Sequence, residues 1–149
     1  MTGVAKKTIE ILIVEDNEGD KIIIEQAFQR AATPYRLSIV TDGQQAIDFL
    51  KKQKQYNQAP DIHMIILDIN LPRKSGMEVL QEVRSNLKTQ QIPVIILTSS
   101  QSQRDIGAFY KNHANCFLTK PIRLDEFNSI LNKMVDFWLG VVQLPQMAI

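Results

Sequence analysis

The sequence predicts an α/β fold in which one parallel sheet is covered by helices on both faces. Short apolar runs alternate along the chain with longer segments of helical periodicity, and such alternation requires crossover connections. Two of the runs, MIIL at 64–67 and VIIL at 94–97, are apolar at every position, as is typical of parallel strands that are buried on both sides. We therefore expect residues 1–149 to form a single domain, with a core at about 9–139 and an apolar extension at 137–149.

Each predicted strand is a short run of mainly apolar or β-branched residues. In chain order the runs are IEILIV at 9–14, YRLSIV at 35–40, IHMIIL at 62–67, PVIILT at 93–98 and CFLT at 116–119. Five runs of this length predict a five-stranded sheet.

The segments between and after these runs have the spacing of amphipathic helices. They are GDKIIIEQAFQRA at 19–31, TDGQQAIDFLKK at 41–52, GMEVLQEVRSNL at 76–87, QRDIGAFYKNHA at 103–114 and LDEFNSILNKMVDFWL at 124–139. Thr41 or Asp42 is the expected N-cap of the second helix. The remaining polar segment, 52–60, is expected to be a loop.

Composition excludes several classes of partner. The 17 basic and 16 acidic side chains nearly cancel, which argues against nucleic acid as a ligand. The uncharged run at the end of the chain, 137–149, is shorter than the ~20 residues of a membrane span. A single cysteine, Cys116, and the absence of a signal peptide favour a reducing cytoplasm.

Polar side chains follow four of the five predicted strands. In an open α/β sheet, ligands bind at the carboxyl ends of the strands. Those ends carry Glu15 and Asp16, then Asp68, Thr98 and Lys120. Each residue alone has an ordinary explanation, such as a turn acid, a strand-ending threonine, a surface cation or an acid pair at a helix N-terminus. Their occurrence together at one edge predicts a functional site.

The chemistry of this set is consistent. Three carboxylates that lie close together repel one another unless a cation joins them. Oxygen ligands without histidine or cysteine select a hard ion, and Mg²⁺ is the expected one. A carboxylate can attack phosphorus, and an ammonium and a hydroxyl can neutralise the transferring phosphoryl group. Asp68, Lys120 and Thr98 match these three roles.

Four motifs together resemble the receiver domain of bacterial two-component response regulators over about Ile9 to Leu139. They are VEDN at 14–17, LDINLPRKSGMEVL at 67–80, ILTSS at 96–100 and FLTKPI at 117–122. The resemblance implies a flavodoxin-like (CheY-like), doubly wound parallel sheet of order 2-1-3-4-5 with five helices. It also implies a function, namely acceptance of a phosphoryl group from a sensor histidine kinase.

The resemblance assigns a role to each site residue. Asp68 is the expected phosphoacceptor, with Thr98 and Lys120 as its catalytic partners. The expected Mg²⁺ ligands are Glu15, Asp16, Asp68 and the backbone carbonyl of Asn70. The expected switch residues are Thr98 and Phe117, and the Lys120–Pro121 peptide bond is expected to be cis.

The same resemblance implies a signalling protein that catalyses only its own phosphorylation and dephosphorylation at Asp68. Its phosphorylation would change the surface of the fourth helix, fifth strand and fifth helix. The chain after Pro121 is too short for a helix-turn-helix domain, so we expect a stand-alone receiver.

The end of the chain is unusually apolar. Together with VEDNEGD at 14–20 and VTDGQQAIDFL at 40–50, the segments FW and VVQLP resemble the small response regulators of cyanobacterial phytochromes. That subgroup implies a phytochrome as the kinase and a homodimer. The expected interface residues are Phe137, Trp138, Leu139 and Val142. The alternative is that this segment folds back on its own domain.

Other functions remain open. The chain could receive its phosphoryl group from a different histidine kinase in a phosphorelay, or be a pseudo-receiver that binds partners without phosphorylation. A haloacid-dehalogenase-type phosphatase is disfavoured because position 70, where its acid would stand, is Asn70. A flavin-binding protein is disfavoured because acids at the first strand end would repel a phosphate.

Overall fold

The computed structural model describes residues 7–146, in which five parallel strands form one sheet of order β2-β1-β3-β4-β5. The ends of the expected domain, residues 1–6, and of its apolar extension, residues 147–149, lie outside the described part. The strands are β1 (Ile9–Val14), β2 (Tyr35–Val40), β3 (Met64–Leu67), β4 (Val94–Thr98) and β5 (Cys116–Thr119). The predicted strand order is confirmed.

Five α-helices alternate with the strands, as predicted. They are α1 (Glu18–Phe28), α2 (Gly43–Leu50), α3 (Gly76–Ser85), α4 (Gln103–Lys111) and α5 (Leu124–Gly140). A 3₁₀ turn, η1 (Lys54–Tyr56), lies within the segment expected to be a loop. Asp42 is the N-cap of α2, since its side chain accepts from the backbone N–H of Gln45 at 2.8 Å. Among the described residues, no helix is long and apolar enough to cross a membrane.

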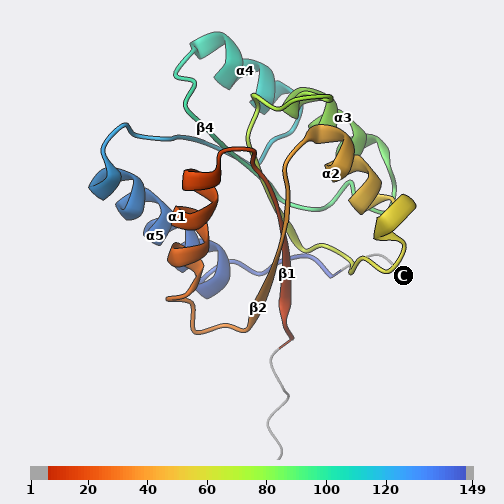
Figure 1. Ribbon diagram of the computed structural model, residues 1–149, viewed down its shortest axis with the longest axis horizontal. Helices are drawn as coiled ribbons and strands as arrows, with labels where there is room; N and C mark the ends of the chain where they lie inside the picture. The colour runs from red at the N-terminus through yellow and green to blue at the C-terminus, as the bar shows by residue number, and fades with distance from the viewer. Residues whose placement is uncertain (1–6, 147–149) are drawn as a thin grey trace, which may run out of the picture.

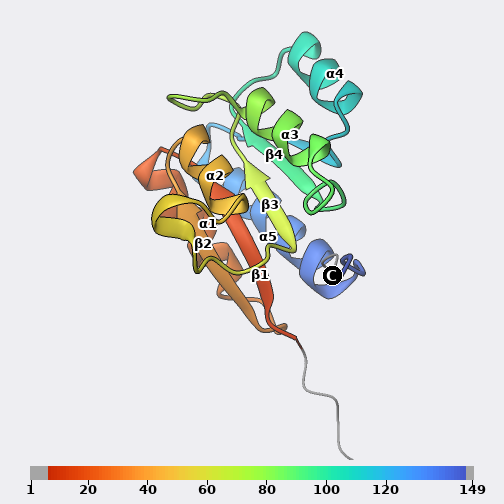
Figure 2. The same ribbon diagram turned by 90° about the vertical axis from the view of Figure 1, so that its right-hand side faces the viewer.

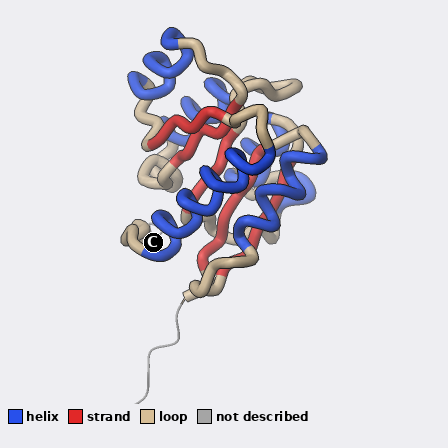
Figure 3. The backbone as a smooth tube through the Cα atoms, turned by 90° about the vertical axis from the view of Figure 1, so that its left-hand side faces the viewer, coloured by secondary structure: helices blue, strands red, loops and turns tan. Residues whose placement is uncertain are grey.

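The helices form a layer on each face of the sheet (Figure 1). Successive strand residues point to opposite faces. In β1, Ile11 and Ile13 therefore belong to the core that includes residues of α1 and α5, whereas Leu12 and Val14 belong to the core under α2 and α3. Figure 3 shows the face of the sheet that α1 and α5 cover, with these two helices side by side in front of the strands. This two-sided burial explains why the central strand β3 is apolar at every position.

Strand register brings the carboxyl ends of β1, β3 and β4 to one edge (Figure 2). Val14 pairs with Leu67, and Leu67 pairs with Ile96. Because Glu15 and Asp68 immediately follow the paired residues Val14 and Leu67, they emerge beside each other. The fold thus places polar residues from separate strands at one edge of the sheet.

The last turn of α5 packs against α1 and the segment that follows it. The guanidinium of Arg30 donates to both carboxylate oxygens of Asp136, at 3.1 and 3.2 Å. The hydroxyl of Thr33 donates to the carbonyl oxygen of Leu139 at 3.0 Å. Residues 142–146 then lie along a groove that is also lined by residues 7–9 and His63. The end of the chain is therefore partly covered by its own domain.

Candidate functional site

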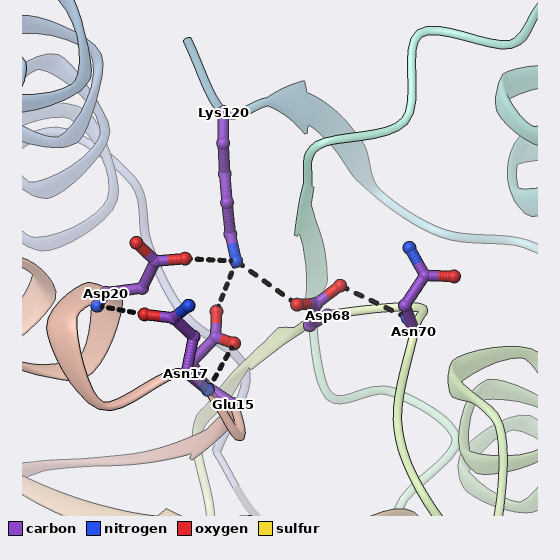
Figure 4. Close-up of polar contacts among 6 residues, drawn as sticks. All are labelled: Glu15, Asn17, Asp20, Asp68, Asn70 and Lys120. Carbon is purple, nitrogen blue, oxygen red and sulfur yellow. Dashed lines mark hydrogen bonds and ion pairs between the residues drawn. The ribbon is translucent and has the colours of Figure 1, made fainter. Parts of the chain in front are cut away.

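The ammonium of Lys120 joins three carboxylates at the edge of the sheet (Figure 4). Its Nζ donates to Oε1 of Glu15 at 2.5 Å, to Oδ2 of Asp20 at 2.9 Å and to Oδ2 of Asp68 at 3.1 Å. An ammonium has three N–H donors and no acceptor, so these three contacts satisfy it completely. One cation from the end of β5 therefore connects the ends of β1 and β3 with the first turn of α1.

Backbone hydrogen bonds hold the acids of this cluster in place. The side chain of Asn17, the N-cap of α1, accepts from the backbone N–H of Asp20 at 2.9 Å, and Oε2 of Glu15 accepts from the N–H of Asn17 at 3.2 Å. After β3, Oδ1 of Asp68 accepts from the N–H of Asn70 at 3.2 Å. The cluster is thus tied to the strand ends rather than carried on free loops.

Glu15, Asp16 and Asp68 form a candidate metal site. Each offers one carboxylate oxygen, and the three oxygens lie within 4.8 Å of one another. Glu15 and Asp68 are buried, whereas Asp16 is exposed. Three hard oxygen ligands with one side open to solvent suit a divalent cation that keeps part of its water shell. The residues therefore fit a divalent metal.

Burial governs the electrostatics of this site. Removal of the Glu15 carboxyl from water raises its pKa to about 7, because this effect and the charge of Asp68 outweigh the hydrogen bond from Lys120. Burial alone would lower the pKa of Lys120, but the hydrogen bonds to Glu15 and Asp20 outweigh it and raise that pKa above its usual range. The site thus holds excess negative charge that one ammonium does not neutralise.

Thr98, at the end of β4, is fully buried, and its hydroxyl is the only buried side-chain polar atom of the described residues without a protein hydrogen-bond partner. An unpaired buried hydroxyl is costly, so its presence at a strand end suggests a partner that arrives from outside the chain. The backbone of the same residue is engaged, since the N–H of Lys120 donates to its carbonyl oxygen at 2.7 Å. Thr98 thereby connects the ends of β4 and β5.

Phe117 lies on the edge strand β5 and is half-buried. Its ring packs against the buried ring of Phe109 on α4, with centroids 6.0 Å apart. Its backbone N–H donates to the hydroxyl of Tyr110 at 3.1 Å. The candidate switch aromatic is therefore linked to α4 through both its ring and its backbone.

Of the predicted site residues, the structure brings together Glu15, Asp16, Asp68 and Lys120. Sequence reasoning missed Asp20, although it lies four residues after Asp16 in the motif VEDNEGD. The predicted cis bond is wrong, because no peptide bond within residues 7–146 is cis and Lys120–Pro121 is therefore trans. The trans form is also the intrinsically favoured isomer of an X–Pro bond.

The four candidate interface residues differ in their environments. Phe137 is 53% exposed, whereas Leu139 is only 7% exposed and packs in the core shared with α1. Trp138 and Val142 are half-buried, and the rings of Phe137 and Trp138 meet edge to face at 5.8 Å. Leu139 therefore stabilises its own domain and is not available to a partner.

Comparisons with known proteins agree with this geometry. A sequence profile of the response regulator receiver domain matches residues 11–132. The response regulator Rcp1 of Synechocystis sp. is 38% identical over 91% of this chain and 92% of its own length.

Two solved structures are similar over nearly their full lengths. The crystal structure of the Mn²⁺-bound form of Rcp1 has a TM-score of 0.91 at 37% identity, and the match covers 93% of this chain and 99% of that one. The phosphorylated cyanobacterial phytochrome response regulator RcpA has a TM-score of 0.90 at 35% identity, with 94% of this chain and 100% of that one covered. The CheY-like fold expected from the sequence is confirmed.

Proposed function

This chain belongs to the response regulator receiver domain family, and on that premise we propose that it relays a signal by accepting a phosphoryl group on Asp68. The observation that carries the proposal is the meeting of the Lys120 ammonium with the carboxylates of Asp68 and Glu15 at the sheet edge. The resting contact between Lys120 and Asp68 supports the proposal, because it places a cation where the charge of the phosphoryl group would develop.

In the proposed reaction, a carboxylate oxygen of Asp68 attacks the phosphorus of a phosphohistidine. A P–O bond forms as the P–N bond breaks, and the imidazole leaves with the bonding pair and takes up a proton. Lys120 neutralises one phosphoryl oxygen, and the unpaired hydroxyl of Thr98 donates to another. In dephosphorylation, water attacks the same phosphorus and loses a proton to solvent, the P–O bond to Asp68 breaks, and inorganic phosphate leaves as the Asp68 carboxylate is regenerated.

We assign the divalent cation as Mg²⁺, held by Glu15, Asp16, Asp68 and the backbone carbonyl of Asn70. When bound, it would neutralise part of the charge on the phosphoryl oxygens. The grouping of three carboxylate oxygens within 4.8 Å supports this assignment, as does the Mn²⁺-bound form of the relative Rcp1.

We propose that the phosphoryl donor is a sensor histidine kinase, and specifically a phytochrome. The support is the similarity to RcpA, which is described as a cyanobacterial phytochrome response regulator. Such a kinase makes its phosphohistidine from ATP, so the proposal places this protein in the cytoplasm. A phosphotransfer profile against purified histidine kinases should show the fastest transfer from the phytochrome, and faster transfer from another kinase would contradict this part of the proposal.

We further propose that Thr98 and Phe117 form the switch. Movement of the Thr98 hydroxyl toward a phosphoryl oxygen would leave space that the ring of Phe117 can enter. The contacts of Phe117 with Phe109 and Tyr110 would carry this change to the surface of α4, β5 and α5. A homodimer through Phe137, Trp138 and Val142 completes the proposal.

The decisive experiment is labelling with acetyl phosphate and MgCl₂, followed by intact mass spectrometry. The natural chain should gain one phosphoryl group, and Asp68→Ala should gain none. The matched control is Asp61→Ala, which removes an exposed carboxylate just before the same strand and should leave labelling unchanged. A natural chain that stays unlabelled would reject the function in favour of a pseudo-receiver.

A further inference from the structure

Asp20 contacts the ammonium of Lys120 but lies outside the candidate metal site. Its Oδ2 accepts from Lys120 at 2.9 Å, whereas the three grouped metal-binding oxygens come from Glu15, Asp16 and Asp68. Its side chain is 24% exposed, so it is more accessible than Glu15 at 2% or Asp68 at 9%. Asp20 thus forms the outer wall of the cluster on the α1 side (Figure 4).

The same carboxylates serve two cations. Glu15 and Asp68 are hydrogen-bonded to the Lys120 ammonium, and both also belong to the candidate metal site. A divalent ion held by their oxygens would compete with the ammonium for these acceptors and would repel it by like charge. Of the three carboxylates that hold Lys120, only Asp20 is free of this competition.

We propose that Asp20 is a positioning residue that retains the Lys120 ammonium when a divalent cation takes the oxygens of Glu15 and Asp68. The inference rests on the proposed function, because it assigns the retained amine to the phosphoryl oxygens of Asp68. Asp20 is suited to this role since its backbone N–H is bound by the N-cap side chain of Asn17, which holds the first turn of α1 in place.

A metal titration by calorimetry on the metal-free protein tests the proposal. Asp20→Asn should raise the dissociation constant for Mg²⁺ about tenfold, because the displaced ammonium then has no charged acceptor. Asp20→Glu keeps the carboxylate, and its dissociation constant for Mg²⁺ should stay within about threefold of that of the natural chain. Glu25→Gln removes the same charge from an exposed position of the same helix, and should leave the constant unchanged.

A double-mutant cycle separates positioning from direct metal binding. If Asp20 acts through Lys120, the effect of Asp20→Asn should shrink to about twofold in a Lys120→Met background. A tenfold effect that persists there would make Asp20 a metal ligand and overturn the proposal. An unchanged dissociation constant in Asp20→Asn, or an equal loss in Glu25→Gln, would also overturn it.

Nuclear magnetic resonance of the Lys120 ammonium gives a direct readout. In saturating Mg²⁺ the natural chain should retain a hydrogen-bonded ammonium signal that Asp20→Asn loses. Labelling by acetyl phosphate at saturating Mg²⁺ should be about tenfold slower in Asp20→Asn, with the loss in the maximal rate. A natural chain that is never labelled would reject the proposed function. Equal labelling rates of the natural chain and Asp20→Asn would reject this inference alone.

Discussion

At the scale of single residues, Glu15 shows how burial and charge compete in this site. Its side chain is 2% exposed and bonded to Lys120, yet its pKa is raised to about 7 from an ordinary 4.5. Desolvation of the carboxylate is the largest cause, and the nearby charge of Asp68 adds to it. In the absence of a metal, ionised Glu15 therefore destabilises the folded protein.

This raised pKa predicts a pH dependence of stability. A carboxyl whose pKa is higher in the folded than in the unfolded chain stabilises the fold fully below pH ~4.5, and this contribution is lost as pH rises to about 7. The free energy of unfolding without metal should therefore fall by up to about 3 kcal/mol between pH 4.5 and 7.5. Urea denaturation across this pH range measures the decrease in the free energy of unfolding, and Glu15→Gln should remove most of that decrease. An equal fall in that variant would contradict the assignment to Glu15.

At the scale of elements, the connection from β3 to α3 determines where Asp68 lies. Gly76, the first residue of α3, packs directly against the backbone that follows β3. A Cβ at this position would lie 2.5 Å from Cα of Ile69 and 2.7 Å from the carbonyl oxygen of Asp68. Both neighbours are backbone atoms, so a side chain here would force the site loop to move.

We therefore expect Gly76→Ala to destabilise the fold by about 1–3 kcal/mol through overpacking. Gly107→Ala is the matched control, because a Cβ there meets nothing within 4 Å in the middle of α4. That substitution should stabilise the helix by about 0.5–1 kcal/mol. Urea denaturation of both variants measures the two changes in the free energy of unfolding. No change in Gly76→Ala would contradict the predicted overpacking.

The link between α4 and β5 makes a second prediction at this scale. β5 is an edge strand, and the hydroxyl of Tyr110 accepts from the otherwise outward N–H of Phe117 at 3.1 Å. Tyr110→Phe removes this acceptor and should weaken local protection by roughly 1 kcal/mol. Hydrogen exchange at the Phe117 amide should accelerate about fivefold, while the amide of Leu97 in β4 should not change. Equal acceleration at both amides would indicate global destabilisation instead.

At the scale of the whole molecule, the sheet could be predicted because each strand carries a strong local signal. The runs at 64–67 and 94–97 are buried on both faces, so their sequence is apolar throughout. Helix ends carry a weaker local signal, and α1 stops at Phe28 although the periodic pattern extends to Ala31. Local periodicity reports which face is buried but does not report where the last turn loses its hydrogen bonds.

The site was predicted where it depends on strand ends and missed where it depends on helix rotation. Glu15, Asp68 and Lys120 follow strands whose order was predicted, so their meeting followed from topology. Asp20 reaches Lys120 only because the first turn of α1 is rotated so that this side chain faces the ammonium. Leu139, which was predicted to face a partner, lies one turn after the buried Val135 and continues the buried face of α5.

The last prediction concerns the oligomeric state, which is a property of the whole molecule. Phe137 and Val141, one turn apart at the end of α5, remain 53% and 67% exposed. Exposed apolar side chains beside a tryptophan are typical of an interface. Phe137→Glu should convert a dimer to a monomer without unfolding it, since the residue is already half in water. Ile22→Glu on α1, where Ile22 is 55% exposed, is the matched control and should leave the oligomeric state unchanged. Light scattering with and without acetyl phosphate measures this, and a natural chain that is monomeric in both conditions would exclude the interface.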